Sequence, residues 1–582
     1  MRPSFLAPVL TPFKNREQLA ANSWRADIAL LGLLVLLTAF VFHGLDQMNQ
    51  PLGVLDSSPL SLDLVHLPEY TLRTTLRMFI ALFASFVFSL VVATLAAKSR
   101  KAAIVILPAL DILQSVPVLG FLTFTVVFFM GLFPGKETGV ECAAIFAIFT
   151  SQVWNMTFSF YQSLRTVPND LYDVSRQFAF SPWQRFIRLE LPFATPGLVW
   201  NMMMSMSGGW FFVVASEAIT VGDTTVSLPG IGSWLALAIE QQNIAAIAWA
   251  VLAMVAVIIA YDLLFFRPIV AWADKFRFEQ TASQKRPRSR VYDLLRSTRL
   301  VPLVLLALGS IKASLFLEKL PRLPSIRFKA SARVSRAADL AWLALVAVAC
   351  IAGILQLSRF IGSTLGWEDV ASTFGLGLIT LVRVSVLIVL ASVVWVPIGV
   401  WIGLNPRWAE RLQPIAQLLA AFPANVLFPF AVIAIVALKL NPDVWLSPLM
   451  ILGTQWYILF NVIAGASALP TDLREAARSF HIHGWQWWRQ VALPGVFPYY
   501  VTGALTAAGG SWNASIVAEA VSWGDQHLYA SGLGAFIAQA TTAGDLHRVA
   551  LGIVVMSIFV VGFNRLLWRP LYGFAERRLR ID

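Results

Sequence analysis

The sequence is poor in charged residues, cysteine and histidine. Asp, Glu, Lys and Arg make up only 13% of the 582 residues, whereas soluble domains contain about 25%. The two cysteines, Cys142 and Cys350, are too few and too far apart for a disulfide framework. His481 and His483 lie close together but have no Cys or carboxylate at metal-binding spacing, so we interpret them as loop residues. These shortages argue against a soluble domain, a disulfide scaffold and a metal site.

Apolar residues dominate the chain. Hydrophobic residues make up 58% of it and the mean hydropathy is +0.70, which predicts a polytopic membrane protein. The net charge of +12 comes from basic residues beside apolar segments, a pattern typical of membrane proteins rather than nucleic-acid binding. At the N-terminus, Lys14, Arg16 and Arg25 lead into a full-length apolar segment with no short cleavable core, which indicates an uncleaved anchor.

Twelve segments are long and apolar enough to cross a bilayer, since a membrane helix needs about 20 residues. The sequence therefore predicts an all-α fold of two six-helix halves. The spans expected in the first half are 28–45, 72–97, 103–133, 141–163, 194–221 and 244–266. Those expected in the second half are 338–357, 373–404, 413–439, 446–468, 496–521 and 546–567.

Basic residues between the spans predict which side each loop faces. The segment 46–70 carries Asp46, Asp56, Asp63 and Glu69 and no Lys or Arg, so we expect it outside. We expect the opposite side, with both termini, to be cytoplasmic. Its basic residues are Lys98, Arg100, Lys101, Arg165, Arg176, Arg185, Arg188, Arg267, Lys275, Arg277, Arg407, Arg411, Arg474, Arg478, Arg489, Arg569, Arg577, Arg578 and Arg580.

A basic segment separates the two halves. Residues 275–336 hold 15 Lys or Arg against 3 acidic residues, which predicts a cytoplasmic linker between a first half at 1–274 and a second at 337–582. The apolar stretch 300–317 lies within it. Lys312 and the basic flanks favour a helix lying on the inner leaflet. A re-entrant element is the alternative.

The two halves are related by an internal repeat. The stretch 168–268 returns at 470–570, shifted by 302 residues. The repeat is clearest in a polar loop at 168–192 and 470–494. Paired residues are Asp170 and Asp472, Leu171 and Leu473, Arg176 and Arg478, Phe178 and Phe480, Trp183 and Trp485, Gln184 and Gln486, Leu191 and Leu493, and Pro192 and Pro494.

This loop resembles the signature of permease subunits of bacterial binding-protein-dependent ABC importers. The family pattern is Glu-Ala-Ala, three residues, Gly, nine residues, Ile, one residue and Leu-Pro. The second copy has Glu475, Ala476, Ala477, His481 in place of Gly, and then Val491, Leu493 and Pro494. The first copy is more divergent, with Asp173, Val174, Ser175, Ala179, Leu189, Leu191 and Pro192. The loss of Gly in both copies puts the helix-to-turn geometry in doubt.

The resemblance implies a type I importer permease whose loops dock on two cytoplasmic ATPase subunits, with a binding protein on the outer face. ATP would be used by those partners, and this chain would bind no cofactor. The coupling residues are then Asp170, Asp173, Arg176 and Trp183 in the first loop and Asp472, Glu475, Ala476, Ala477, Arg478 and Trp485 in the second. Because Asp173 is shorter than Glu475 and Val174 lowers helix propensity, we expect the second loop to bind its ATPase more strongly.

A second resemblance is to the nitrate, sulfonate, taurine and bicarbonate branch of that family. It rests on a Gly-rich helix after each loop, and on Gly230-Ile231-Gly232 matched by Gly532-Leu533-Gly534. The family usually has one six-helix subunit that dimerises, so this chain looks like two subunits fused. The residues assigned to a translocation path between the halves are Gly208, Gly209, Trp210, Glu217, Gly509, Gly510, Trp512 and Glu519.

The role of these path residues stays open. Glu217 and Glu519 are ionisable groups at the ends of apolar helices, which suggests a functional role. The alternative is a carboxylate hydrogen-bonded to a neighbouring helix or loop backbone. In the same way, the Gly pairs could serve close helix packing or line a cavity. Like-charge repulsion from Glu217 and Glu519 argues mildly against a bare anion at their level.

Three classes of function are compatible with a twelve-span repeat protein. An ABC importer permease in a bacterial inner membrane fits the loops. A secondary transporter with two six-helix halves is the alternative, but Ala96-Ala97-Lys98-Ser99-Arg100 replaces the loop motif expected after the second helix of the major facilitator family. A membrane enzyme is disfavoured because the sequence offers no acid–base, nucleophile or nucleotide-binding constellation.

Overall fold

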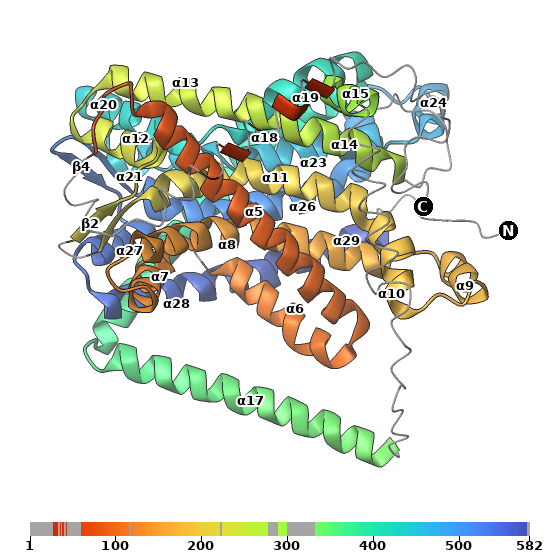
Figure 1. The fold of residues 1–582 in the computed structure, drawn as a ribbon, viewed down its shortest axis with the longest axis horizontal. Helices are drawn as coiled ribbons and strands as arrows, with labels where there is room; N and C mark the ends of the chain where they lie inside the picture. Colours follow the sequence, from red (N-terminus) through yellow and green to blue (C-terminus); the bar gives the residue numbers. More distant parts are fainter. Residues whose placement is uncertain are drawn as a thin grey trace.

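The computed structural model describes residues 60–116, 118–221, 224–276, 289–298 and 332–578, with scattered positions between 27 and 42. The expected span 28–45 falls largely outside these residues, and so does the apolar stretch 300–317. The described chain is almost entirely helical (Figure 1).

The first half contains these elements in chain order. They are α5 (Leu67–Lys98), α6 (Arg100–Ser115), α7 (Val118–Leu132), α8 (Glu137–Arg165), α9 (Asn169–Gln177), α10 (Pro182–Arg185), η1 (Phe186–Glu190), α11 (Leu191–Glu217), β1 (Ala218–Val221), β2 (Thr224–Ser227), α12 (Ile231–Glu240), α13 (Ile244–Tyr261), η2 (Asp262–Phe266), α14 (Arg267–Ala273) and η3 (Asp274–Phe276). In the linker, α15 spans Arg290–Ser297.

The second half begins with a long helix and then follows the same plan. Its elements are α17 (Ala332–Gly362), α18 (Trp367–Leu404), α19 (Pro406–Ala421), η4 (Ala424–Leu427), α20 (Phe428–Ala437), α21 (Pro442–Trp445), α22 (Leu449–Leu452), α23 (Gln455–Ser467), α24 (Thr471–Ser479), α25 (Gly484–Trp487), η5 (Trp488–Ala492), α26 (Leu493–Ala518), β3 (Ala520–Trp523), β4 (Gln526–Tyr529), α27 (Leu533–Thr542), α28 (Leu546–Phe563), η6 (Asn564–Trp568) and α29 (Arg569–Arg578).

Among the described residues, seven helices are long and apolar enough to span a membrane, or eight if the bent pair Pro442–Leu452 and Gln455–Ser467 counts as one span. The helix α8 also has the length of a span but is more polar. The chain is therefore a multi-pass helical membrane protein, as expected. The count of twelve spans stays a prediction.

Several expected spans are interrupted. The segment 103–133 is two helices, because Val116 is extended before Pro117 and a residue preceding proline is disfavoured in the helical region. The segment 413–439 is also broken at a proline: α19 ends at Ala421, and Pro423 is extended before the short helix η4. The segments 194–221 and 496–521 are helical only as far as Glu217 and Ala518, and each continues into a strand.

The two strands in each half form a short antiparallel hairpin. In the first, Ala218 pairs with Ser227 and Val221 with Thr224; in the second, Ala520 pairs with Tyr529 and Trp523 with Gln526. The hairpins lie at one end of the molecule, while α9, α10 and α24 lie at the opposite end (Figure 1). A long helix connects the two ends in each half: α11 in the first and α26 in the second.

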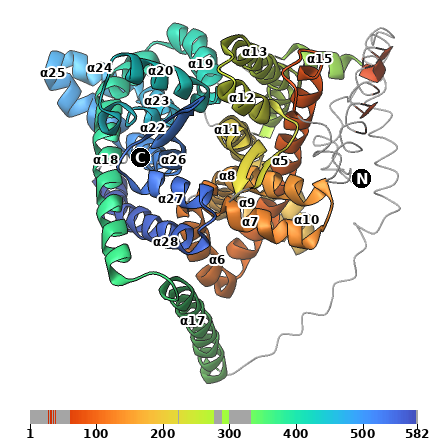
Figure 2. The same ribbon diagram turned by 90° about the vertical axis from the view of Figure 1, so that its left-hand side faces the viewer.

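Each half has its own hydrophobic core, and the halves pack side by side (Figure 2). They also interlock. The helix α7 contacts α26, α27 and α28 of the second half, and α19 contacts α11 and α13 of the first. At the break before α7, the Val118 N–H donates to Asn513 Oδ1 at 2.8 Å. At the break after α19, Asn425 Nδ2 donates to the Phe211 carbonyl at 3.4 Å. The helix α17 contacts α6 and α28 and otherwise lies apart from the bundle (Figures 1 and 2).

Candidate functional site

Each repeated loop folds as two short helices joined by a tight turn. In the first loop, α10 begins with a capping box: the Ser181 hydroxyl accepts the Gln184 N–H at 3.2 Å, and the Gln184 side chain accepts the Ser181 N–H at 2.9 Å. The second loop begins α25 at Gly484 without such a side-chain cap. Each loop then runs through a five-residue π-helix, η1 or η5, into the long helix that crosses the molecule. Such π segments are rare and are often found at functional sites.

The turn between the two short helices has a left-handed residue where the family pattern has Gly. Ala179 has φ +50° and His481 has φ +52°. Both turns close with the same two backbone bonds: Ala179 N to Arg176 O and Phe180 N to Ser175 O in the first, His481 N to Arg478 O and Ile482 N to Ala477 O in the second. The expected turn therefore forms without glycine, with residues that rarely adopt this conformation.

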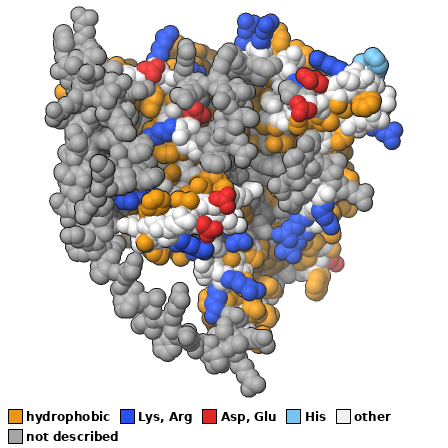
Figure 3. Space-filling model, turned by 90° about the vertical axis from the view of Figure 1, so that its right-hand side faces the viewer, with side chains coloured by type: hydrophobic (Ala, Val, Ile, Leu, Met, Phe, Trp, Pro, Cys, Tyr) orange, Lys and Arg blue, Asp and Glu red, His pale blue; other side chains and the backbone are white. Residues whose placement is uncertain are grey.

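Nine of the ten predicted coupling residues are exposed. They are Asp170, Asp173, Arg176, Trp183, Asp472, Glu475, Ala476, Arg478 and Trp485. The exception is Ala477, which is 4% exposed and faces inward, as does its counterpart Ser175. Ala477 is thus part of the packing beneath the turn, and the coupling role of all ten residues stays a prediction. Figure 3 shows this end of the molecule, where Lys and Arg side chains lie among hydrophobic ones.

The two loops differ in how they are held. In the first, Lys98 at the end of α5 forms an ion pair with Glu190 (Nζ to Oε2 2.8 Å) and lies 5.1 Å from the centre of the Phe186 ring. Trp183 stacks on the same Phe186 ring and is 45% exposed. In the second loop Ala492 takes the place of Glu190, and Trp485 is 75% exposed. The second loop therefore offers the more accessible aromatic side chain.

At the hairpin end of the first half, Glu217 belongs to a buried cluster of charges. Its Oε1 accepts from Arg77 Nη1 and from the Thr74 hydroxyl, both at 2.7 Å. The Gly232 N–H donates to its Oε2 at 2.6 Å. Arg77 also binds Glu141 through two hydrogen bonds of 2.6 Å. Glu217 and Arg77 are fully buried, and Glu141 nearly so. Each charge is thus paired, as burial requires.

The second half repeats this cluster around Glu519. Its Oε1 accepts from Arg383 Nη1 and from the Thr380 hydroxyl, both at 3.0 Å, and its Oε2 accepts from the Gly534 N–H at 2.7 Å. Arg383 also donates to Asp443 at 3.0 Å. This cluster is nearer to solvent, because the Arg383 side chain is 11% exposed and that of Asp443 is 45% exposed.

The paired Gly-x-Gly motifs fit these carboxylates. A Cβ added to Gly230 would collide with the Glu217 carboxylate, and a Cβ added to Gly532 would collide with that of Glu519. Both glycines are extended, at φ −179° and −168°, so close approach rather than backbone conformation requires glycine here. The second glycine of each motif donates the backbone N–H to the carboxylate.

The residues expected along the path do not lie together. Trp210, Glu217, Trp512 and Glu519 are at most 1% exposed, enclosed within their own halves. Trp210 donates to the Tyr261 hydroxyl at 3.2 Å. In this structure these four side chains are enclosed, as the packing alternative expects, and their path assignment stays a prediction. Gly209 and Gly510 likewise face neighbouring side chains, those of Gln152 and Thr454.

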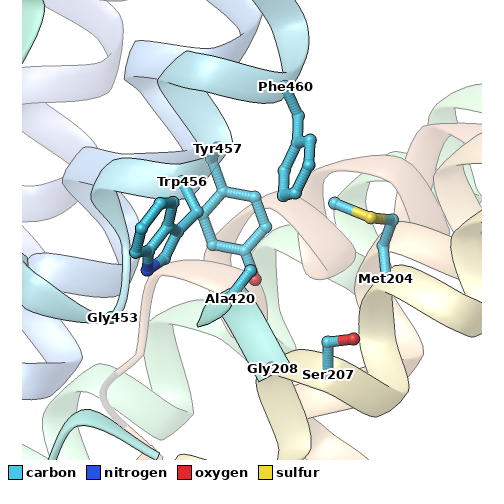
Figure 4. A pocket seen from close by; sticks show the side chains of 8 residues that line it. All are labelled: Met204, Ser207, Gly208, Ala420, Gly453, Trp456, Tyr457 and Phe460. Atoms are coloured by element: carbon cyan, nitrogen blue, oxygen red, sulfur yellow. The ribbon is translucent and has the colours of Figure 1, made fainter. Parts of the chain in front are cut away.

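Gly208 lines a cavity between the two halves (Figure 4). One wall comes from α11, and the other from α19 and the α22–α23 region. Its volume is about 10 Å³, on the order of one water molecule. The lining residues are Met204, Ser207, Gly208, Ala420, Gly453, Trp456, Tyr457 and Phe460. Gly509 has open space around its Cα, with nothing within 4 Å of an added Cβ.

Sequence reasoning missed the partners of the two glutamates. Thr74 and Arg77 correspond to Thr380 and Arg383 with a shift of 306 residues, whereas Glu141 and Asp443 keep the shift of 302. The offset between the halves is 306 residues for the arginine-bearing helices and 302 for the residues that follow, so a search at an offset of 302 alone does not pair the two arginines. A Thr-x-x-Arg pattern in both α5 and α18 was the available signal.

The repeated loops, the two interlocked halves and the long helices joining loop to hairpin are features of one class of membrane transport protein. The model of the binding-protein-dependent transport system inner membrane component family matches residues 69–274 and 395–580. The chain belongs to this family and carries two of its units. It is a permease, the non-catalytic transport component of an ABC importer.

Relatives with curated descriptions agree with this assignment. The chain is 29% identical over 203 residues to a nitrate import permease protein NrtB of Leptolyngbya laminosa, covering 35% of this chain and 67% of the relative. It is 29% identical over 188 residues to a bicarbonate transport system permease protein CmpB of Synechococcus elongatus, covering 32% and 62%. A glycine betaine/proline betaine permease protein ProW of Escherichia coli is 32% identical over 137 residues, covering 23% and 36%.

Proposed function

We propose that this chain alone supplies both membrane halves of an importer, with one ATPase subunit docked on each repeated loop and a binding protein delivering solute at the hairpin end. The observation that carries the proposal is the pair of helix–turn–helix loops at one end of the molecule, each presenting an exposed tryptophan. Exposed aromatics beside charged residues are the usual anchors of a protein interface.

The arrangement suggests how docking would move the membrane helices. Each loop runs without a break through its π segment into α11 or α26. Closure of two ATPase subunits on ATP binding would pull both loops, and the two long helices would carry that movement into the interface between the halves. The ATPases would be separate polypeptides, both termini would be cytoplasmic, and the membrane would be a bacterial inner membrane.

The solute we propose is a small one of the nitrate, sulfonate, taurine or bicarbonate kind. Two relatives are described as nitrate and bicarbonate permeases. The buried ion pairs of Glu217 and Glu519 support this choice, because carboxylates that are neutralised by arginine and enclosed within a half do not repel an anion in the path.

Co-purification tests the docking. The permease is expressed with its candidate ATPase, and the complex is isolated through a tag on the permease. We expect Glu475→Lys to lower the retained ATPase and the coupled uptake, because it reverses the charge of an exposed residue on α24. Glu368→Lys, on an exposed face at the start of α18, is the matched control. Transport that proceeds with no ATPase present would instead support a secondary transporter.

A further inference from the structure

The cavity between the halves is bounded by the two helices attached to the repeated loops. Ser207 and Gly208 lie on α11, which begins directly after the π segment of the first loop. Trp456, Tyr457 and Phe460 lie on α23, which is separated from α24 of the second loop by three residues. A movement of either loop therefore displaces one wall of this cavity.

The chemistry of the lining is specific. The cavity is lined by no Asp, Glu, Lys, Arg or His. Its polar side-chain groups are the hydroxyls of Tyr457 and Ser207 and the indole N–H of Trp456, all of them neutral. The Tyr457 hydroxyl lies beside Gly208, where an added Cβ would be 3.0 Å from it (Figure 4). No described residue accepts a hydrogen bond from this hydroxyl. Ser207 donates to the Met203 carbonyl at 3.2 Å and also forms a side-chain hydrogen bond with Tyr261, so a ligand would compete with two local partners.

We propose that this cavity is the closed constriction of the translocation path, and that Tyr457 and Ser207 are its specificity residues for a small oxyanion. The assignment rests on the proposed importer function. Neutral donors suit a passing anion, because they replace part of its hydration without holding it as a buried cation would. A cationic solute would find no carboxylate here. One face of the aromatic wall is also occupied, since Trp456 packs against Trp395 with the ring centres 5.1 Å apart.

The closed state follows from size. A cavity of about 10 Å³ holds one water molecule and is too small for nitrate or hydrogen carbonate. Passage of the anion requires α11 and α23 to separate, and this separation would break the contact between the Tyr457 hydroxyl and Gly208. Glycine at 208 leaves room for the hydroxyl, and alanine would fill that room.

The test uses the complete complex, with ATPase subunits and binding protein, in proteoliposomes. Uptake of labelled nitrate, hydrogen carbonate and glycine betaine is measured together with ATP hydrolysis. We expect Tyr457→Phe to lower the uptake efficiency of the transported anion about tenfold, the effect of losing one hydrogen bond to a charged group. ATPase retention should not change. Tyr500→Phe is the control, because it removes a hydroxyl that bonds Ser392 outside the cavity.

A double substitution separates this role from packing. Gly208→Ala should lower uptake, because its methyl group would lie 3.0 Å from the Tyr457 hydroxyl and displace it. Adding Tyr457→Phe should recover part of the rate, because the atom that meets the new methyl group is gone. Normal anion uptake by both Tyr457→Phe and Ser207→Ala would overturn the inference, as would a double variant no better than Gly208→Ala. Uptake of glycine betaine but of neither anion would also overturn it. Failure of ATPase subunits to associate with the unmodified chain would refute the importer proposal itself.

Discussion

Ala179 and His481 stand where the family pattern has Gly, and both adopt the left-handed conformation that the turn requires. Each turn has a positive φ at this position, although a positive φ is unfavourable for alanine and histidine. For a non-glycine residue this conformation costs about 1–2 kcal/mol. The same two hydrogen bonds close both turns, so the geometry is retained at the expense of local stability.

Replacing these residues by glycine should stabilise the loops. We expect Ala179→Gly and His481→Gly each to gain about 0.5–1 kcal/mol, since the relief of strain exceeds the added chain entropy of glycine. Hydrogen exchange in α9 and α24 should slow by a few-fold. The control is Ala476→Gly within α24, which should speed exchange because glycine is unfavourable inside a helix. Faster exchange in Ala179→Gly would show that the left-handed turn is not the stable form.

The two charge clusters predict unequal sensitivity to the same substitution. Glu217→Gln leaves fully buried Arg77 short of one carboxylate, which should lower stability on the order of 3 kcal/mol. Glu519→Gln should cost less, because Arg383 and Asp443 are partly in contact with solvent. Folded yield and the thermal unfolding midpoint of purified protein measure the difference, with Glu240→Gln at an exposed position as control. A normal yield combined with altered transport selectivity would support the path role of these glutamates.

At the scale of elements, the two loops differ in how much their tryptophan should contribute to ATPase binding. Trp485 is the more exposed, and Trp183 is partly covered by its stacking on Phe186. We expect Trp485→Ala to reduce ATPase retention more than Trp183→Ala, by a difference on the order of 1 kcal/mol in binding. Titrating purified ATPase onto each variant measures both affinities. Equal losses would mean that the two loops contribute alike despite their different surroundings.

The sequence was sufficient for some elements and not for others. The loops, their register and the two related halves followed from the repeat, because Trp183 and Trp485 or Asp170 and Asp472 keep one spacing. The helix breaks before Pro117 and Pro423 were overlooked, although proline signals them, because both neighbouring segments are apolar. The hairpins after Glu217 and Ala518 were not predicted, because their first strands contain apolar residues that also fit a continuing membrane helix. The Thr-x-x-Arg pattern marked the arginines in α5 and α18, but pairing them with the glutamates required knowledge of which helices pack together.

At the scale of the whole molecule, the orientation in the membrane can be tested with one labelling site at each end of the bundle. Phe480 directly follows α24, and Asp525 lies in the turn between β3 and β4. Helix α24 and this hairpin lie at opposite ends of the bundle (Figure 1). After replacement of Cys142 and Cys350 by serine, we expect a cysteine introduced at Phe480 to react only with reagents that enter the cytoplasm. A cysteine at Asp525 should react with an impermeant reagent added to intact cells. The reverse pattern would invert the proposed orientation.

The helix α11 has one further consequence when it is considered as a lever. It is 27 residues long, about 40 Å at 1.5 Å per residue. Three hydrogen bonds to Glu217 hold one end, which is then the fulcrum, and in the proposed function the ATPase would act at the opposite end, next to the loop. Gly208 lies about one third of the way from the fulcrum. A swing of about 4 Å at the loop therefore becomes a movement of about 1.3 Å at the cavity wall. The movement at the cavity wall is smaller than the movement at the loop, and the force there is correspondingly larger, which favours separation of two closely packed surfaces.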